Sequence, residues 1–171
     1  MRVTRKAGKI DALRHAIEGL DGAQGRVGWF ASAVYEGGQP VAGIAHVQEF
    51  GSPKHNIPPR SFMRSTASEK ANDWRHTAEQ VSRAAAQGKI APEKVMEAVA
   101  LAAEGHVRET ITKITAPALK QATIDARKRR LADGGKSVTG KKGGAGVAGI
   151  TKPLVDTGIL LNSLTSETEK K

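Results

Sequence analysis

His46 and Glu49 are the residues whose types and spacing come closest to a metal-binding or catalytic motif. They lie three positions apart in the segment VAGIAHVQEF, and residues at that spacing share one face of a helix. Together with His55 they offer the donor set of a metal-dependent enzyme such as a nuclease. The HExxH arrangement, with its second histidine and general base, is absent from the sequence. We therefore favour the structural interpretation, in which His46 and Glu49 form a polar pair beside a buried Phe50.

Motifs for covalent catalysis and for phosphate binding are also absent from the sequence. It contains no cysteine, no G-x-S-x-G element, and no S-x-x-K element followed by its partner motifs. The segment GGKSVTG looks like a Gly-rich phosphate loop, but the spacing G-x-x-x-x-G-K-[ST] requires a glycine where Arg130 stands. We expect neither an enzyme nor a bound cofactor.

The chain has a formal charge of +10, and its densest basic cluster lies in the second half. Such a charge attracts nucleic acid or an acidic protein surface, and charge alone does not distinguish the two. A solvated basic surface without a partner is the remaining alternative. Base-specific recognition is not expected, because no aromatic residue lies within the cluster. The candidate contact residues are Arg127, Lys128, Arg129, Arg130, Lys136, Lys141 and Lys142.

Length and composition favour a single domain over residues 1–171. Aromatic residues make up only 4% of the chain, against 39% for all apolar types. This balance favours Ala-rich helices with thin interfaces over an aromatic-lined substrate pocket. Because there is no run of 18 or more apolar residues and no apolar segment of a secretion signal near the N-terminus, we expect no membrane association.

The elements of the first half follow from apolar spacing and from turn residues. Residues 4–20 form an amphipathic helical arm, with an apolar side that carries Ile10, Leu13, Ile17 and Leu20. Residues 21–25, DGAQG, break this helix. The β-rich segment that follows, ending at Gly37-Gly38, predicts one strand or a hairpin.

The middle of the chain alternates between helices and an irregular connection. Residues 41–50 are ambiguous between strand and helix, and we prefer the helix because Gly51 stands where a C-terminal stop belongs. The three prolines of residues 52–60 predict an irregular, extended connection. Two long helices follow, one over residues 61–87 and one beginning near Pro92, and we expect them to form an antiparallel hairpin.

The last third of the chain begins with Pro117, which interrupts the second long helix, and a polar, basic stretch follows. Residues 133–149 are rich in glycine and lysine and predict a mobile basic loop. In the C-terminal segment, either Asp156 or Thr157 caps a short helix, or the chain runs into a final strand. The order of elements indicates an α+β fold, in which a small antiparallel sheet packs with a long helical hairpin.

Two segments together resemble a known family. The first is IAHVQEFGSPKHNIPPRSFMR (44–64), and the second is ITKITAPALKQATIDARKRR followed by KPLVDTGILLNSLT (152–165). They resemble the neck and tail-completion proteins of long-tailed bacteriophages, also called virion morphogenesis proteins. The sequence departs from the family pattern at Gln48, Ser61 and Ala118. The residues that stand in the family's motif positions are Glu49, Phe50, Gly51, Ile57, Pro58, Arg60, Phe62, Pro153, Leu154, Asp156, Thr157, Gly158, Leu160 and Ser163.

The resemblance implies a structural protein of the virion. It implies an α+β subunit without catalysis, assembled in the host cytoplasm into a homo-oligomeric ring, a hexamer, at the head–tail junction or the top of the tail. Its partners are other neck and tail proteins. Genomic DNA passes through the lumen of the ring, where it can contact the protein nonspecifically.

The same residues also suggest roles within the fold. We expect Ile57, Phe62, Leu154 and Leu160 to hold the core, and Gly51 and Gly158 to adopt backbone conformations that other residues resist. We expect Asp156 to cap the final helix and Arg60 to pair with an acid such as Glu49.

Two rival functions remain open at this point. The first is a nonspecific DNA-binding protein, which the basic cluster favours and which requires binding that falls steeply with salt. The second is the metal-dependent enzyme based on His46, Glu49 and His55.

Overall fold

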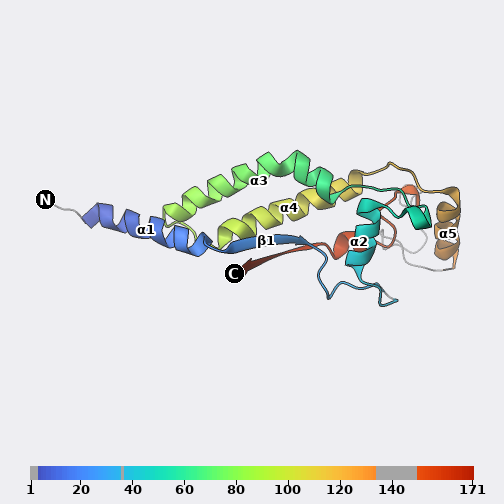
Figure 1. Ribbon diagram of the computed structural model, residues 1–171, viewed down its shortest axis with the longest axis horizontal. Coiled ribbons are helices and arrows are strands. Elements are labelled where there is room, and N and C mark those ends of the chain that lie inside the picture. Colours follow the sequence, from blue (N-terminus) through green and yellow to red (C-terminus); the bar gives the residue numbers. More distant parts are fainter. Residues whose placement is uncertain (1–3, 36, 134–149) are drawn as a thin grey trace. The chain divides into compact units, whose positions relative to one another are not determined.

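The computed structural model describes residues 4–35, 37–133 and 150–171 (Figure 1). The chain divides into two compact units, each made of segments distant in sequence. Unit 1 comprises Met1–Gly28, Ala67–His106 and Thr165–Lys171, and unit 2 comprises Trp29–Thr66 and Val107–Leu164. The loop predicted over residues 133–149 lies outside the described residues apart from Asp133, and so do Lys136, Lys141 and Lys142.

The α+β fold class is confirmed. Helices α1 (Thr4–Leu20), α2 (Val41–Phe50), α3 (Met63–Ala86), α4 (Lys94–Lys113), α5 (Gln121–Ala132) and α7 (Ile159–Asn162) accompany the short 3-10 helix η1 (Pro53–His55). Strands β1 (Ala23–Gly28) and β2 (Thr165–Lys170) form an antiparallel two-stranded sheet. Among the described residues, no helix is long and apolar enough to cross a membrane.

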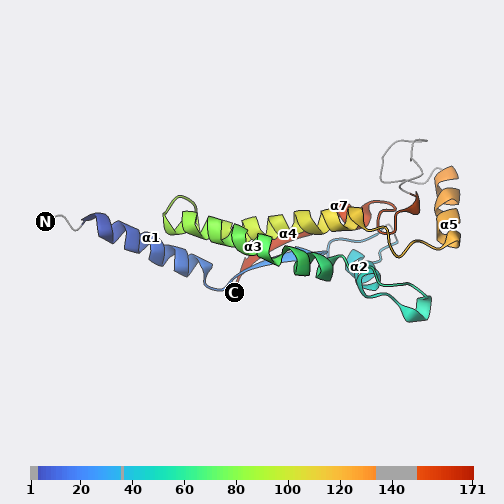
Figure 2. The same cartoon turned by 90° about the horizontal axis from the view of Figure 1, so that it is seen from above.

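Unit 1 contains the predicted helical hairpin. The parts of α3 and α4 that belong to it run antiparallel beside each other in both views (Figures 1 and 2). The Trp74 Nε1–H donates to Nδ1 of His106 at 2.9 Å, and the two rings stack, which ties the helices together. A small core of Ala16, Ala85 and Val95 joins α1 to this hairpin.

The side of α1 that faces this core is only in part the predicted one, since Leu20 packs against the core. Ile10, Leu13 and Ile17 are 58%, 49% and 61% exposed, whereas Ala16 is buried. The reason is close approach, because a Cβ on Gly19 would lie only 2.4 Å from Cβ of Pro92. The helix therefore packs through Ala16, Gly19 and Leu20 and leaves Ile10, Leu13 and Ile17 exposed.

The sheet of unit 1 begins earlier than predicted. β1 starts at Ala23, inside the segment predicted as a break, because β2 supplies hydrogen-bond partners from Lys170 back to Thr165. Gly25 lies close to α4, since a Cβ there would lie 3.1 Å from Cβ of Ala100. The rest of the predicted β segment is irregular, apart from a bridge between Val34 and Pro40.

Unit 2 contains the segments that were singled out in the sequence. The helix preferred over residues 41–50 is confirmed as α2, and Gly51 follows it with φ 78°. The basic stretch after Pro117 forms α5, a helix that the sequence did not indicate. Near the C-terminus both alternatives occur, since α7 is followed directly by β2. Phe62 is fully buried, and its ring and that of Trp29 lie edge to face at a centroid distance of 5.7 Å.

Candidate functional site

The first motif segment is organised by the carboxylate of Glu49, which is only 4% exposed. It accepts hydrogen bonds from the backbone N–H groups of Phe62 at 2.7 Å, Met63 at 2.9 Å and Arg64 at 3.2 Å. The hydroxyl of Ser61 and Nε of Arg64 also donate to it, at 2.8 and 2.9 Å. Glu49 thus satisfies the free N–H groups at the start of α3, as a capping residue does, from 13 to 15 positions away.

These hydrogen bonds control the charge of Glu49. Burial alone raises the pKa of a carboxyl group, because it disfavours the charged form. Hydrogen bonds from Met63, Arg64, Ser61 and Phe62 outweigh that effect, and the pKa of Glu49 lies below its ordinary value. Glu49 is therefore held as a carboxylate.

Arg60 binds backbone carbonyls rather than an acid. Its Nε and Nη2 donate to the carbonyl oxygens of Pro117 at 2.9 Å and Ala118 at 3.4 Å, and Nη1 donates to Oε1 of Gln48 at 3.1 Å. Burial, followed by the positive charge of Arg127, lowers the pKa of Arg60. The predicted pair between Arg60 and Glu49 is wrong, because the two side chains serve different backbone segments.

Arg127 also binds backbone carbonyl groups, in this case those of the second motif segment. It is 8% exposed. Its guanidinium donates to the carbonyl oxygens of Ile150 at 3.1 Å, Lys152 at 2.7 Å and Pro153 at 3.1 Å. Burial lowers its pKa although the charge of Asp156 opposes this. The side chain therefore ties residues 150–153 to α5.

Asp156 belongs to the same cluster. Both of its carboxylate oxygens accept from the guanidinium of Arg130, one at 2.8 Å, and Nε of Arg127 lies 3.5 Å from it. The prediction that Asp156 caps the final helix is wrong, because α7 begins after Gly158 without a side-chain cap. The Thr157 hydroxyl accepts a long hydrogen bond from the Ile159 N–H at 3.5 Å.

The basic cluster is thus divided between internal and exposed groups. Arg127 is a fold residue rather than the exposed contact that the sequence suggested, and Arg130 is bound to Asp156. Lys128 and Arg129 are exposed on α5, each near Asp125. Contact with phosphate or with an acidic partner stays a prediction for these two residues.

A cavity of about 310 Å³ adjoins this cluster and brings together residues from both motif segments. Burial, and then the charge of Asp156, raises the pKa of Tyr35, so that its hydroxyl stays protonated there. Of the polar groups around the cavity, Asp156 binds Arg130 and lies 3.5 Å from Nε of Arg127, and Gln48 accepts from Arg60. The cavity is lined by Tyr35, Ile44, Gln48, Arg127, Arg130, Pro153, Leu154, Asp156, Thr157, Gly158 and Leu160.

His46, Glu49 and His55, the residues of the metal-enzyme hypothesis, make other contacts. The His46 ring lies 4.7 Å from that of Phe50, and Nδ1 of His55 lies 2.9 Å from Oγ of Ser52. Phe50 is 50% exposed rather than buried, with the Arg64 guanidinium 4.4 Å from its ring centre. Within residues 4–35, 37–133 and 150–171, no group of three or more His, Asp or Glu side chains is placed to hold a metal ion.

The remaining motif residues have the structural surroundings of a packed framework. Phe62, Leu154 and Leu160 are buried as predicted, whereas Ile57 is half-buried and Pro58 follows it at the same intermediate depth. Gly158 has φ 79°, and Pro153 is buried. Ser163 donates its hydroxyl proton to the carbonyl oxygen of Ile159 within α7.

Trp29 has a structural role that the sequence patterns did not indicate. Its Nε1–H donates to the carbonyl oxygen of Leu160 at 2.8 Å while its ring packs on Phe62, so that one side chain joins the two motif segments. A signal for this role existed, because the chain has only 2 tryptophans among very few aromatic residues.

No family model, curated protein or solved structure matches the chain.

Proposed function

We propose that this protein is a structural component of a tailed-phage virion, a neck or tail-completion subunit that assembles into a ring at the head–tail junction or the top of the tail. The observation that carries the proposal is the meeting of the two motif segments. Residues 44–64 and 152–165 are separated by almost 90 residues in the chain, and both lie in unit 2, where Trp29 contacts each of them.

The chemistry of the motif residues supports a structural role. Glu49 binds backbone N–H groups, and Arg60 and Arg127 bind backbone carbonyl groups. Charged groups committed in this way fix the path of the chain, because leaving any of them unpaired in a buried place is costly. Such buried contacts make a subunit rigid, and a rigid subunit keeps the shape that fits its neighbours in an assembly.

Exposed apolar side chains support assembly. Ile10, Leu13 and Ile17 lie on one side of α1 and are about half exposed or more. Single exposed apolar residues are ordinary on protein surfaces, whereas contiguous patches mark contact sites. Ring formation needs contact surfaces of this kind on each subunit.

A second candidate function, nonspecific DNA binding, is favoured by the distribution of charge. Unit 2 carries 14 Lys and Arg against 6 Asp and Glu, so that 14 − 6 = +8 of the total of +10 belongs to it. This charge is compatible with DNA that passes through a ring. As an independent function it requires binding whose logarithm falls linearly with the logarithm of salt concentration.

Location in the particle tests the structural proposal. Purified virions are analysed by mass spectrometry for this chain, and a tagged copy is located by cryo-electron microscopy. The proposal expects a ring of copies at the neck or tail top. A chain that is absent from purified virions contradicts it, whatever its affinity for DNA.

A further inference from the structure

The two-stranded sheet of unit 1 has two open edges. Strands β1 and β2 pair only with each other among the described residues. An isolated pair of strands is marginally stable, and an unpaired edge is a template for another strand. Each edge therefore offers backbone groups that a further strand can bind.

The ladder determines which backbone groups are free. The Lys171 N–H donates to the Gly22 carbonyl oxygen at 3.0 Å, next to the pair Ala23–Lys170. Antiparallel pairs alternate between hydrogen-bonded and non-bonded positions. The backbone groups of Gly25 and Thr168, which face each other at a non-bonded position, therefore point outward to opposite edges. Both residues are exposed, so neither edge is covered at its centre.

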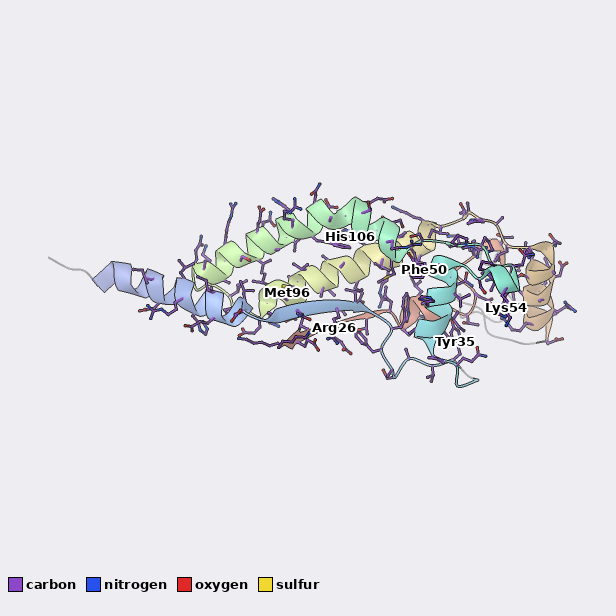
Figure 3. All side chains as sticks on the ribbon, in the orientation of Figure 1. Arg26, Tyr35, Phe50, Lys54, Met96 and His106 are labelled. Carbon is purple, nitrogen blue, oxygen red and sulfur yellow. The ribbon has the colours of Figure 1, made fainter. Side chains whose placement is uncertain are left out.

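The side chains on the outer face of the sheet give each edge a charge. Arg26 projects on the side of β1 away from Met96 and α4 (Figure 3), because Gly25 beside it faces the helix. Arg26 forms an ion pair with Glu169, and both side chains are exposed, by 51% and 38%. Glu167 lies directly across from Arg26 and has no ion-pair partner among the described residues. The β1 edge is thus basic and the β2 edge is acidic.

We propose that a second copy of this chain completes the sheet, with β1 of one copy adding antiparallel beside β2 of the next. Arg26 of the incoming strand then lies beside the unpaired Glu167. Pairing β2 with β2 would bring carboxylates together, which is unfavourable, so charge selects the β1–β2 contact. This contact joins two different edges, and repeated addition of this kind closes into a ring when the rotation between copies allows it. The inference rests on the proposed function, since it names the surface by which the ring assembles.

Proline at position 168 tests the edge. Thr168→Pro removes an N–H that points outward, a position where an edge strand tolerates proline, and Thr168→Ala is the matched control that keeps the N–H. Sedimentation velocity over a concentration series measures self-association, and circular dichroism checks the fold. We expect wild type and Thr168→Ala to associate alike. Thr168→Pro should need about tenfold more protein for half-association, as the loss of one hydrogen bond per contact implies.

A charge-swap mixture gives a second test that does not depend on how well Thr168→Pro folds. Arg26→Glu and Glu167→Arg each place like charges at the contact and should each associate weakly. An equimolar mixture of the two variants restores opposite charges at every contact and should associate like wild type. Mixing leaves any change within a single copy unrepaired, so recovery reports contact between copies.

Three results would overturn the inference. They are a monomeric wild type at every concentration, association by Thr168→Pro equal to that of Thr168→Ala, and a charge-swap mixture that associates no better than its components. Association that persists in Thr168→Pro leaves the ring proposal intact and removes only this surface. Absence of the chain from virions removes the ring proposal and leaves the measured self-association as it stands.

Discussion

Replacement of Glu49 should destabilise the protein much more than replacement of its ion-pair partner. Glu49 is buried and accepts from the N–H groups of Phe62, Met63 and Arg64 at the start of α3, whereas the Arg64 side chain is 59% exposed. If the carboxylate acts through the helix start, its removal leaves those N–H groups unpaired. If the salt bridge were the important contact, removing either partner would have the same effect.

The size of the effect follows from burial and from the groups left unpaired. Loss of a helix cap costs about 0.5–2 kcal/mol, and breaking a buried charged contact costs about 3–5 kcal/mol. Water can reach the half-buried Met63 N–H region, so we expect about 3 kcal/mol for Glu49→Ala. Glu49→Gln keeps one acceptor and should cost about 2 kcal/mol. Arg64→Ala loses an exposed ion pair and a cation–π contact with Phe50, which together amount to about 1 kcal/mol or less.

The assay is urea unfolding followed by the fluorescence of Trp29. A Trp74→Phe background leaves Trp29 as the single tryptophan, and its ring packs on Phe62, whose N–H is bound by Glu49. The free energy of unfolding is compared between the three variants and this parent. A cost below about 0.5 kcal/mol for Glu49→Ala, or an equal cost for Arg64→Ala, would refute the reasoning.

Three further predictions concern the same unit. The pKa of Glu49 is lowered in the folded state, so its stabilising contribution is complete above its ordinary pKa of 4.5 and is lost as the pH falls below that value. Acid unfolding curves should show this loss of stability in the parent and not in Glu49→Gln. Arg127→Lys cannot reach three carbonyl groups with one ammonium and should cost about 2 kcal/mol in thermal or urea unfolding, while Lys128→Ala, at an exposed position, should cost less than about 0.5 kcal/mol. Gly51→Ala should cost about 1–2 kcal/mol, because φ is 78° and a Cβ would lie 2.9 Å from the Ile57 carbonyl oxygen, and an equally stable variant would contradict this.

Local signals in the sequence were sufficient where structure depends on near neighbours. The helix over residues 41–50, its stop at Gly51 and the hairpin turn at Gly88 follow from apolar spacing and from glycines with positive φ. The same holds for the burial of Phe62 and Leu160, whose size and flanking pattern favour the core.

Partners distant in the chain were not predictable in this way. Arg60 and Glu49 were matched by charge, although the structure gives Arg60 the carbonyl groups of residues 117 and 118 and gives Glu49 the start of α3. Backbone N–H and C=O groups occur at every position, so the sequence does not indicate which of them a buried side chain will find. Apolar spacing predicts the apolar side of α1 but not how much of it is buried. Leu20 packs against the core, whereas Ile10, Leu13 and Ile17 are exposed, because the approach of Pro92 to Gly19 turns small residues toward the hairpin.

Apolar periodicity and the conformational limits of glycine and proline act over a few residues, and they were sufficient to predict the fold class and most of the helices. Which charged side chains are buried in the fold, and which edges and faces remain exposed, depends on the tertiary structure. Arg127 and Lys128 are adjacent and alike in charge, yet one is buried against three carbonyl groups and the other is exposed. The difference arises from the direction of each side chain on α5 relative to residues 150–153, which chain composition does not specify.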